Sequence, residues 1–300
     1  MVDDLTTILS ACGRKVGPQE IRHAQDVAHL CRGLSCRELA LTLCEHWGWV
    51  GATGKPQVSA CCKLLDRLER EGLLTLPARR GPGSKPGRCR VEVASAETSA
   101  GPPVECELRS VQPVGLEPVV GREEGARWNG LVERYHPLGF KRPFGCALRY
   151  YVASPRGQLG CLLMASGARA LRSRDEWIGW SAQQRLANLP LVINNSRFLL
   201  FPWVRVPHLA SHVLGQLARQ VQQDWRARWG YRPVLMETFV DPAQHRGVCY
   251  RAAGWQLIGQ TTGEGLRLRG HTYRTSRKLI LVRPLVGDFR THLLRDPEPV

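Results

Sequence analysis

The sequence lacks the hydrophobic stretches of a membrane protein. No apolar run reaches the roughly 18 residues that cross a bilayer. The first residues, MVDDLTTILSACGRK, place acids where a secretory signal carries positive charge. We therefore expect a cytoplasmic protein with no membrane partner. Its 300 residues, 43% of them hydrophobic, are enough for two globular domains with buried cores.

Cysteines with the spacing of a metal site are also missing. The eleven cysteines form no C-x-x-C pair, whereas zinc fingers and ribbons need two closely spaced ligand pairs to close a tetrahedral site. Cys44, Cys61 and Cys62 fall on helices expected from the apolar pattern, where cysteine behaves as a small buried hydrophobe. The pattern predicts reduced structural thiols.

Acidic residues are few, and the resulting excess of basic residues lies mainly in one part of the chain. Lys and Arg total 42 against 26 Asp and Glu, which gives a net charge of +16. Residues 123–300 carry +14 of this surplus, residues 1–80 carry +2, and residues 81–122 are neutral. Such a field favours a polyanion, and nucleic acid is the commonest one inside a cell. The alternative is a surface whose charge maintains solubility.

Residues 1–80 have the pattern of a small helical domain. Helices are expected at 21–31, from Ser35 onward, and at 57–70, and Glu38 follows Ser35 at the spacing of a capping box. A short strand and a basic hairpin are expected next. Helices followed by such a hairpin are the order of a winged helix-turn-helix.

A winged helix places one helix in the major groove of DNA and its hairpin against phosphates. The residues expected to face DNA from the helix are Gln57, Ser59, Lys63 and Arg67. The residues expected to reach phosphates from the wing are Arg79, Arg80, Lys85, Arg88 and Arg90. The alternative is a helical module that contacts protein, because this segment carries little net charge.

Two further segments follow this head. Residues 81–122 are rich in proline, glycine and valine with little periodicity, which indicates a linker whose GPGSKPG part could also form the tip of the wing. Residues 123–300 alternate strand-like and helix-like segments, which predicts a mixed α/β body. Strands are expected at 147–153, 159–165, 191–193, 197–202, 234–240, 255–259 and 279–282, and helices at 175–187, 207–229 and 244–253.

Several long strings of the body resemble a known family. WIGWSAQQRLANL, NNSRFLLFPWVRVPHLASHVL, PVLMETFVD and GVCYRAAGWQLIGQTTG are similar to strings of the DUF4338 family. That family includes the DruA-like proteins of the Druantia anti-phage system, and similar segments accompany some transposases. The resemblance covers about residues 125–285. It implies antiviral defence or association with a mobile element, together with other proteins of such a system.

A weaker resemblance is to the GNAT acyltransferase fold. RFLLFPWVRV, PHLASHVLGQLARQV, VLMETFVD and CYRAAGWQLIG follow one another in the order of its central strand, phosphate-gripping helix, next strand and tyrosine-bearing segment. This resemblance implies a GNAT-like mixed sheet and acyl-CoA as a cofactor. Residues 206–211 lack the glycines that let backbone N–H groups approach the phosphates of coenzyme A.

Two acids stand near the end of an expected strand. Glu237 and Asp241 are four residues apart, so both side chains emerge on the same face of an extended strand. Paired carboxylates could hold Mg²⁺ or divide acid and base roles, as in a metal-dependent nuclease or a transposase-type enzyme. The alternative is that Glu237 pairs with a buried arginine while Asp241 caps the next helix. Tyr250 is a candidate general acid, with core packing as the alternative.

The remaining candidates are polar or basic. Asn194-Asn195-Ser196-Arg197 is expected to form a turn that reads a base edge or simply closes as an Asx turn. Residues 266–284 hold six basic side chains and no acid, which indicates a nucleic-acid contact or, alternatively, a disordered basic loop. The expected phosphate contacts there are Arg267, Arg269, Arg274, Arg277 and Lys278.

Together these observations favour a DNA-associated protein with a winged-helix head and an Arg-rich α/β body. Two alternatives stay open. One is a GNAT-like acyltransferase that uses acyl-CoA, and the other is a metal-dependent nuclease that uses Glu237 and Asp241. The sequence does not decide whether the body is catalytic, or whether it binds DNA or RNA.

Overall fold

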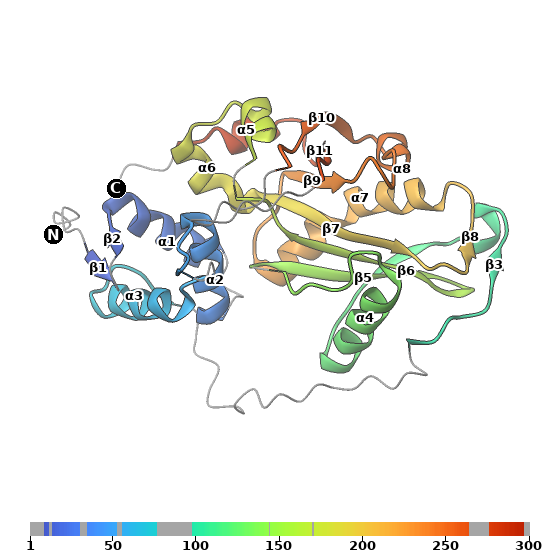
Figure 1. The fold of residues 1–300 in the computed structure, drawn as a ribbon, viewed down its shortest axis with the longest axis horizontal. Coiled ribbons are helices and arrows are strands. Elements are labelled where there is room, and N and C mark those ends of the chain that lie inside the picture. Colours follow the sequence, from blue (N-terminus) through green and yellow to red (C-terminus); the bar gives the residue numbers. More distant parts are fainter. Residues whose placement is uncertain are drawn as a thin grey trace.

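The computed structural model describes residues 9–11, 14–30, 35–52, 56–76, 98–143, 145–169, 171–263 and 276–296. Figure 1 shows a small helical unit, in blue, beside a larger unit built on one sheet. Within these ranges, no helix is both long enough and apolar enough to span a bilayer.

The N-terminal unit, here called the head, is a cluster of three helices with a short β-hairpin. Its elements are β1 (Leu9–Ala11), β2 (Arg14–Val16), α1 (Pro18–Leu30), α2 (Cys36–Trp47) and α3 (Val58–Arg70). Ser35 and Glu38 exchange hydrogen bonds before α2, as the expected capping box requires. Leu39 and Leu43 of α2 and Leu64 of α3 are buried between the helices. The three expected helices are confirmed.

The wing expected after these helices lies mostly outside the described residues. Residues 73–76 follow α3 without strand pairing. The basic residues assigned to the wing are not among those described: Arg79, Arg80, Lys85, Arg88 and Arg90. The winged-helix interpretation of the head therefore stays a prediction.

The larger unit, here called the body, is built on a seven-stranded sheet with the order β10-β11-β9-β7-β6-β5-β4. All neighbouring strands run antiparallel except β7 and β9. The parallel pairing of these two covers only Val192–Asn194 and Leu235–Glu237. The strands are β4 (Gly115–Pro118), β5 (Ala147–Ser154), β6 (Gly157–Ser166), β7 (Val192–Leu200), β9 (Leu235–Val240), β10 (Gln256–Gln260) and β11 (Leu279–Pro284).

Helices cover both faces of the sheet (Figure 1), which confirms the mixed α/β class. Arg149 of β5 bonds to Asn129 of α4 (Arg122–Tyr135) on one face. The adjacent Tyr150 lies beside Asp224 of α7 (Leu209–Trp229) on the other, because successive strand residues point to opposite faces. The other elements are β3 (Val104–Glu105), β8 (Val204–Arg205), α5 (Arg172–Ile178), α6 (Ala182–Asn188), α8 (Val248–Ala252), α9 (Phe289–Leu293) and two 3-10 turns at Leu108–Val111 and Leu189–Leu191.

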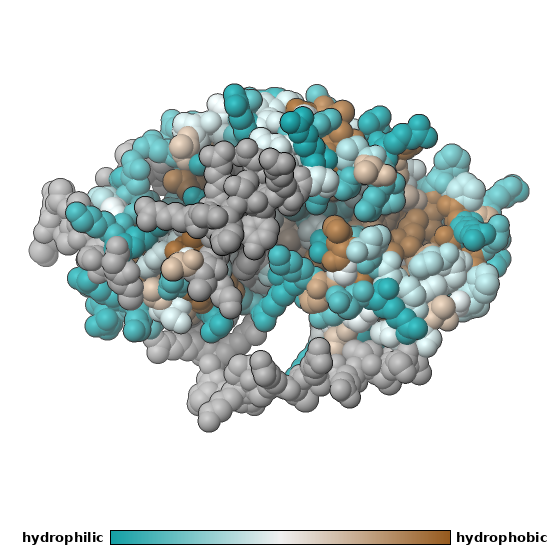
Figure 2. Space-filling model, viewed as in Figure 1, coloured by the Kyte–Doolittle hydropathy of each residue, from teal (hydrophilic) through white to brown (hydrophobic). Residues whose placement is uncertain are grey.

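One continuous hydrophobic core runs through the head and the body. Leu43 and Leu64 of the head and Trp128 and Trp225 of the two large body helices all belong to it and are fully buried. The head is therefore packed against the body. In Figure 2 hydrophilic residues are spread widely over the coloured part of the surface, and a hydrophobic area lies toward the end of the molecule that carries β8.

Three expectations about the body need correction. The second half of the expected linker 81–122 belongs to the fold, because β4 pairs with β5 as an edge strand that tolerates Pro118. The helix expected at 175–187 is two helices, since Gly179 takes a left-handed backbone conformation that ends α5 and Ser181 starts α6 with a capping box. The helix expected at 244–253 is shorter, because its helical turns begin only at Val248.

Candidate functional site

The polar motif Asn194–Arg197 lies inside strand β7 and not in a turn, which corrects the sequence-based expectation. Strand β6 pairs with β7 at Asn195 and at Arg197 but skips Ser196, so Ser196 is the extra residue of a β-bulge. A bulge shifts the side chains beyond it to the opposite face. As a result Asn194 and Arg197, whose spacing would place them on opposite faces of a regular strand, share one face.

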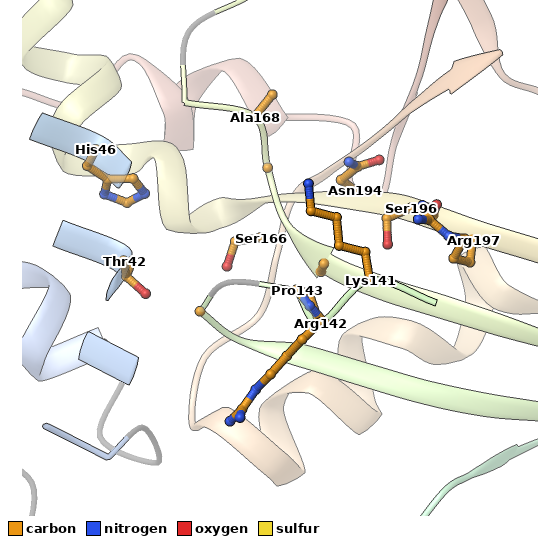
Figure 3. A pocket seen from close by; sticks show the side chains of 13 residues that line it. Thr42, His46, Lys141, Arg142, Pro143, Ser166, Ala168, Asn194, Ser196 and Arg197 are labelled. Atoms are coloured by element: carbon orange, nitrogen blue, oxygen red, sulfur yellow. Dashed lines mark hydrogen bonds between the residues drawn. The ribbon is translucent and has the colours of Figure 1, made fainter. Parts of the chain in front are cut away.

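That shared face opens into a pocket between the head and the body, here called the polar pocket (Figure 3). Its volume is about 310 Å³. Its lining comes from α2 of the head, the segment before β5, the end of β6, and β7. The side chains labelled there are Thr42, His46, Lys141, Arg142, Pro143, Ser166, Ala168, Asn194, Ser196 and Arg197.

Three cations line the polar pocket, and its described lining contains no carboxylate. Arg197 is the most constrained of them. Its guanidinium donates to the carbonyl oxygens of Gly139 at 2.8 Å and Ser196 at 2.7 Å, and burial lowers its pKa. Within the described residues Arg197 bonds only to carbonyl groups, so no carboxylate there compensates its charge, which favours a bound anion.

The other two cations are more accessible. Lys141 points its ammonium group toward Asn194 across the pocket (Figure 3). Arg142 is 78% exposed at the rim, where it lies 3.6 Å from Glu38 of the head. His46 adds no charge at neutral pH, because burial and the adjacent His23 hold its pKa well below 6.5.

Two buried polar atoms of the polar pocket have no hydrogen-bond partner in the described part of the chain. They are the Oδ1 of Asn194 and the Oγ of Ser196. Leaving such a group unsatisfied costs about 1–3 kcal/mol. The pocket therefore combines fixed positive charge with two polar atoms that are buried in its wall.

A second cavity of about 620 Å³, here called the apolar cavity, lies where β7 and β9 are no longer paired. The hydroxyl of Tyr250 donates to the Oδ1 of Asn195 at 2.7 Å, and Thr238 donates to the backbone carbonyl of Asn195 at 3.0 Å. All three residues are buried, and burial raises the pKa of Tyr250. Exposed Leu138 and Val248 give the cavity an apolar rim.

Glu237 and Asp241 have separate roles in the structure. Glu237 is fully buried, with its Oε2 at 2.9 Å from the Nη1 of Arg174 and its Oε1 accepting from the N–H of Ala168. Asp241 is partly exposed and accepts hydrogen bonds from Ser276 and the N–H of Ala243, which lower its pKa. The ion pair of Glu237 is the alternative expected from the sequence, whereas Asp241 lies in a turn and does not cap the next helix, whose N-cap is Gly247. No three His, Cys, Asp or Glu residues in the described ranges cluster closely enough to hold a metal ion.

The other predicted nucleic-acid contacts lie elsewhere on the molecule. The four assigned to the head are all exposed on α3 or just before it: Gln57, Ser59, Lys63 and Arg67. Arg67 is paired with Glu71 at 2.6 Å. Arg277 is exposed and Lys278 lines the apolar cavity, while Arg267, Arg269 and Arg274 lie outside the described residues.

Sequence reasoning missed part of the polar pocket. Lys141 and Arg142 stand side by side before an expected strand, and this pair of cations was the only available signal. Thr42 and His46 could not be recognised from the sequence, because they reach the pocket only through the docking of the head on the body.

A family model described as Druantia protein DruA matches residues 92–272, which is more than half of the chain. The chain belongs to the DruA family. This confirms the family resemblance found in the sequence. The matched residues include all of β7 and β9, whereas Thr42 and His46 of the polar pocket lie outside the DruA match. Among curated proteins there is no match.

Several solved acyltransferases are similar to this DruA-family chain at low identity. A Bacillus subtilis acetyltransferase in complex with CoA is 9% identical, covers 57% of this chain and 100% of its own, and has a TM-score of 0.36. FeeM, an N-acyl amino acid synthase from uncultured soil microbes, is 13% identical, with coverages of 60% and 93% and a TM-score of 0.35. The aminoglycoside acetyltransferase AAC(6')-Ib, solved with coenzyme A and kanamycin, is 14% identical, with coverages of 46% and 66% and a TM-score of 0.30. We draw nothing from these likenesses, because all three TM-scores are below 0.5.

Proposed function

We propose that this DruA-family protein serves a phage-defence or mobile-element system by binding nucleic acid in the polar pocket. The observation that carries the proposal is the lining itself, whose described residues include three cations and no carboxylate. Phosphate groups suit such a site, because Lys and Arg neutralise them and release their counterions. Other proteins of the same system are its expected partners.

The charge around the pocket supports this proposal. Burial and the nearby Arg142 together lower the pKa of Arg149, so positive charges lie close enough to repel one another. Residues 123–300 carry most of the +16 net charge of the chain. Cations that the fold holds close together gain free energy when a polyanion binds. The exposed side of α3 and the basic segment 266–284 are proposed as secondary contacts.

The salt dependence of binding tests the proposal. We expect fluorescence anisotropy with single-stranded DNA, and with RNA of the same sequence, to give affinities that fall steeply with salt. Replacing Lys141 and Arg142 together by alanine should weaken binding. It should also reduce the slope of log K against log salt by about 1.4, since each lost phosphate contact on a single strand is worth about 0.7.

A matched control removes two cations far from the pocket. Arg109, which pairs with Glu107, and Arg205 of β8 are both exposed at the end of the molecule that carries β3 and β8. Alanine at both positions changes the net charge by the same amount but should leave the slope unchanged. Equal losses in the two double variants would contradict binding at the polar pocket.

The apolar cavity favours a second candidate, an acyltransferase that uses acyl-CoA. Its support is the combination of an apolar rim and the buried Tyr250 hydroxyl, a group able to act as a general acid. In the GNAT fold, glycines in the loop before this helix let backbone N–H groups approach the phosphates of coenzyme A. The loop before α7 has no glycine, and its His208 takes a left-handed backbone conformation at the helix N-cap. Thermal-shift titration with coenzyme A and with DNA separates the candidates. A rise in the melting temperature with coenzyme A alone supports the acyltransferase.

A further inference from the structure

The apolar cavity lies between two strands of the sheet that separate. Strands β7 and β9 run parallel, and they are paired only as far as Asn194 and Glu237. Beyond these residues β7 continues to Leu200 and β9 to Val240, each with another strand on its far side. Within the described part of the chain, no strand pairs with the two edges that face each other beyond that point. Two unpaired strand edges therefore line the cavity.

Backbone groups of β7 point into the cavity. The N–H of Phe201 donates to the carbonyl of Leu159, at the start of the pairing with β6, over 3.0 Å. The direction of hydrogen bonding alternates along a strand, so the N–H and C=O groups of Phe198 and Leu200 point away from β6. Both residues line the cavity, and both are partly exposed.

Strand β9 presents one further residue of this kind. The C=O of Val234, just before β9, accepts from the N–H of Leu285, just after β11, at 2.9 Å. By the same alternation, the N–H and C=O groups of Phe239 point away from β11 and toward β7. Unpaired N–H and C=O groups along a strand edge are a template for an added strand. The cavity therefore offers main-chain hydrogen bonds to an extended chain.

The rim of the cavity is apolar and basic. Leu138 and Val248 are 60% and 62% exposed, and apolar side chains that are exposed together at one cavity are typical of a binding surface. Arg246 and Lys278 also line it, against Asp241 as the one carboxylate of its described lining. Because two cations face one acid, the rim suits a ligand that carries a single carboxylate beside apolar groups.

We propose that the apolar cavity binds an extended segment of a partner protein, which adds to β7 as a strand. The backbone of this segment pairs with Phe198 and Leu200. Its apolar side chains contact Leu138 and Val248, and an acidic residue near one end lies beside Arg246. Main-chain bonds supply the affinity in this mode of recognition, and the side-chain contacts supply the specificity. The cavity volume of about 620 Å³ admits only a short segment.

This inference goes beyond the proposed nucleic-acid binding and does not depend on it, because the apolar cavity shares only Ser196 with the polar pocket. It does compete with the second candidate, which places acyl-CoA in the same cavity. The observations favour the peptide. Coenzyme A carries several phosphate charges, whereas the rim has a surplus of one cation and the loop before α7 has no glycine.

Random linear octapeptides selected on the full chain supply the probe. We expect the enriched peptides to alternate apolar residues and to carry an acid near one end. The strongest binder is resynthesised with capped ends and with N-methyl groups on either of its two alternating sets of amides, which leaves every side chain in place. One set faces β7 and the other faces β9.

Methylation of the set that faces β7 should lower the affinity about 10- to 100-fold, as for two lost hydrogen bonds. The other set should cost less, because β9 offers only Phe239. Fluorescence anisotropy measures both affinities. An affinity that neither set of methyl groups changes would show a contact through side chains alone and overturn the inference, as would the failure of any peptide to be enriched.

Two double variants locate the peptide. Leu138→Gln with Val248→Gln removes the apolar rim without changing the charge, and it should weaken peptide binding about 10-fold. Val120→Gln with Leu257→Gln is the matched control, because these residues are 80% and 44% exposed and lie outside the cavity lining. The control should bind the peptide as the wild type does. Equal losses in the two double variants overturn the inference.

Coenzyme A and DNA complete the experiment. Coenzyme A that displaces the peptide with an affinity equal to or higher than that of the peptide would assign the cavity to acyl-CoA and overturn the inference. Single-stranded DNA is titrated against the same protein without peptide. A lack of DNA binding would contradict the proposed function alone, and the peptide affinities would still decide whether a partner segment binds in the apolar cavity.

Discussion

The Nη1 of Arg174 lies 2.9 Å from the Oε2 of Glu237, and both side chains are fully buried. The pair joins α5 to β9, an interior strand of the sheet. Arg174 also donates to the carbonyl of Ala168, whose N–H in turn bonds to Glu237. Because Ala168 lines the polar pocket, this buried pair holds one wall of the pocket in place.

Removing one member of this pair should destabilise the protein strongly. Glu237→Gln removes one of the two carboxylates that neutralise buried Arg174, while Asp175 stays 2.8 Å from its Nη2. Breaking a buried pair costs about 3–5 kcal/mol when no other partner remains, so a loss toward the lower end of that range is expected. Urea unfolding followed by far-UV circular dichroism measures the loss. Asp241→Asn, directly after the same strand, is the matched control, and its solvent-facing side chain predicts a much smaller shift of the midpoint. Overlapping curves for Glu237→Gln and the wild type would contradict the structural role of the pair.

The local elements of the fold were predictable because they depend on nearby residues. The Ser35–Glu38 capping box, the apolar faces of α2 and α3, the β5–β6 hairpin and the stripe along α7 were all visible in the sequence. The break at Gly179 was harder to predict, because glycine inside a helical pattern is often tolerated. The helical spacing of apolar residues continues across Gly179.

The candidate site was less predictable, because pairing and docking create it. Asn194–Arg197 looks like a turn, since polar residues between two apolar segments usually form one. In the structure the motif continues β7, and the bulge at Ser196 depends on the register with β6. The polar pocket also needs Thr42 and His46, which the head contributes from a distant part of the chain. Neither the register of β6 with β7 nor the docking of the head on the body can be predicted from the local spacing of residues in the sequence.

Tyr250→Phe tests whether this hydroxyl stabilises the core. The change leaves the buried Oδ1 of Asn195 without the donor that lies 2.7 Å away, and a loss of about 1–3 kcal/mol in the free energy of unfolding is expected. Chemical denaturation measures it. Tyr135→Phe is the control, because its hydroxyl bonds to a backbone carbonyl at a partly exposed position. A larger loss in the control than in Tyr250→Phe would show that the Asn195 contact contributes little.

Acid should weaken the head through its buried histidines. Burial lowers the pKa of His23 from 6.5 to about 4, and its ring accepts from the Nε1 of Trp47 and contacts His46. Below pH 6.5 the unfolded chain therefore binds a proton that folded His23 does not. The free energy of unfolding should be constant with pH above 6.5 and fall by about 3 kcal/mol as pH drops toward 4.

Urea midpoints measured at intervals from pH 7.5 to 4.5 would record this loss and separate it from other titrations. His23→Gln keeps an acceptor for Trp47 but has no titrating group, so its midpoint should depend less on pH than that of the wild type between 6.5 and 5. His208→Gln, at an exposed position, should follow the wild type. Glu20, which lies close enough to raise the pKa of His23 slightly, is unchanged in both variants and cancels from the comparison. Parallel pH profiles for His23→Gln and the wild type would show that His23 is protonated equally in the folded and unfolded states.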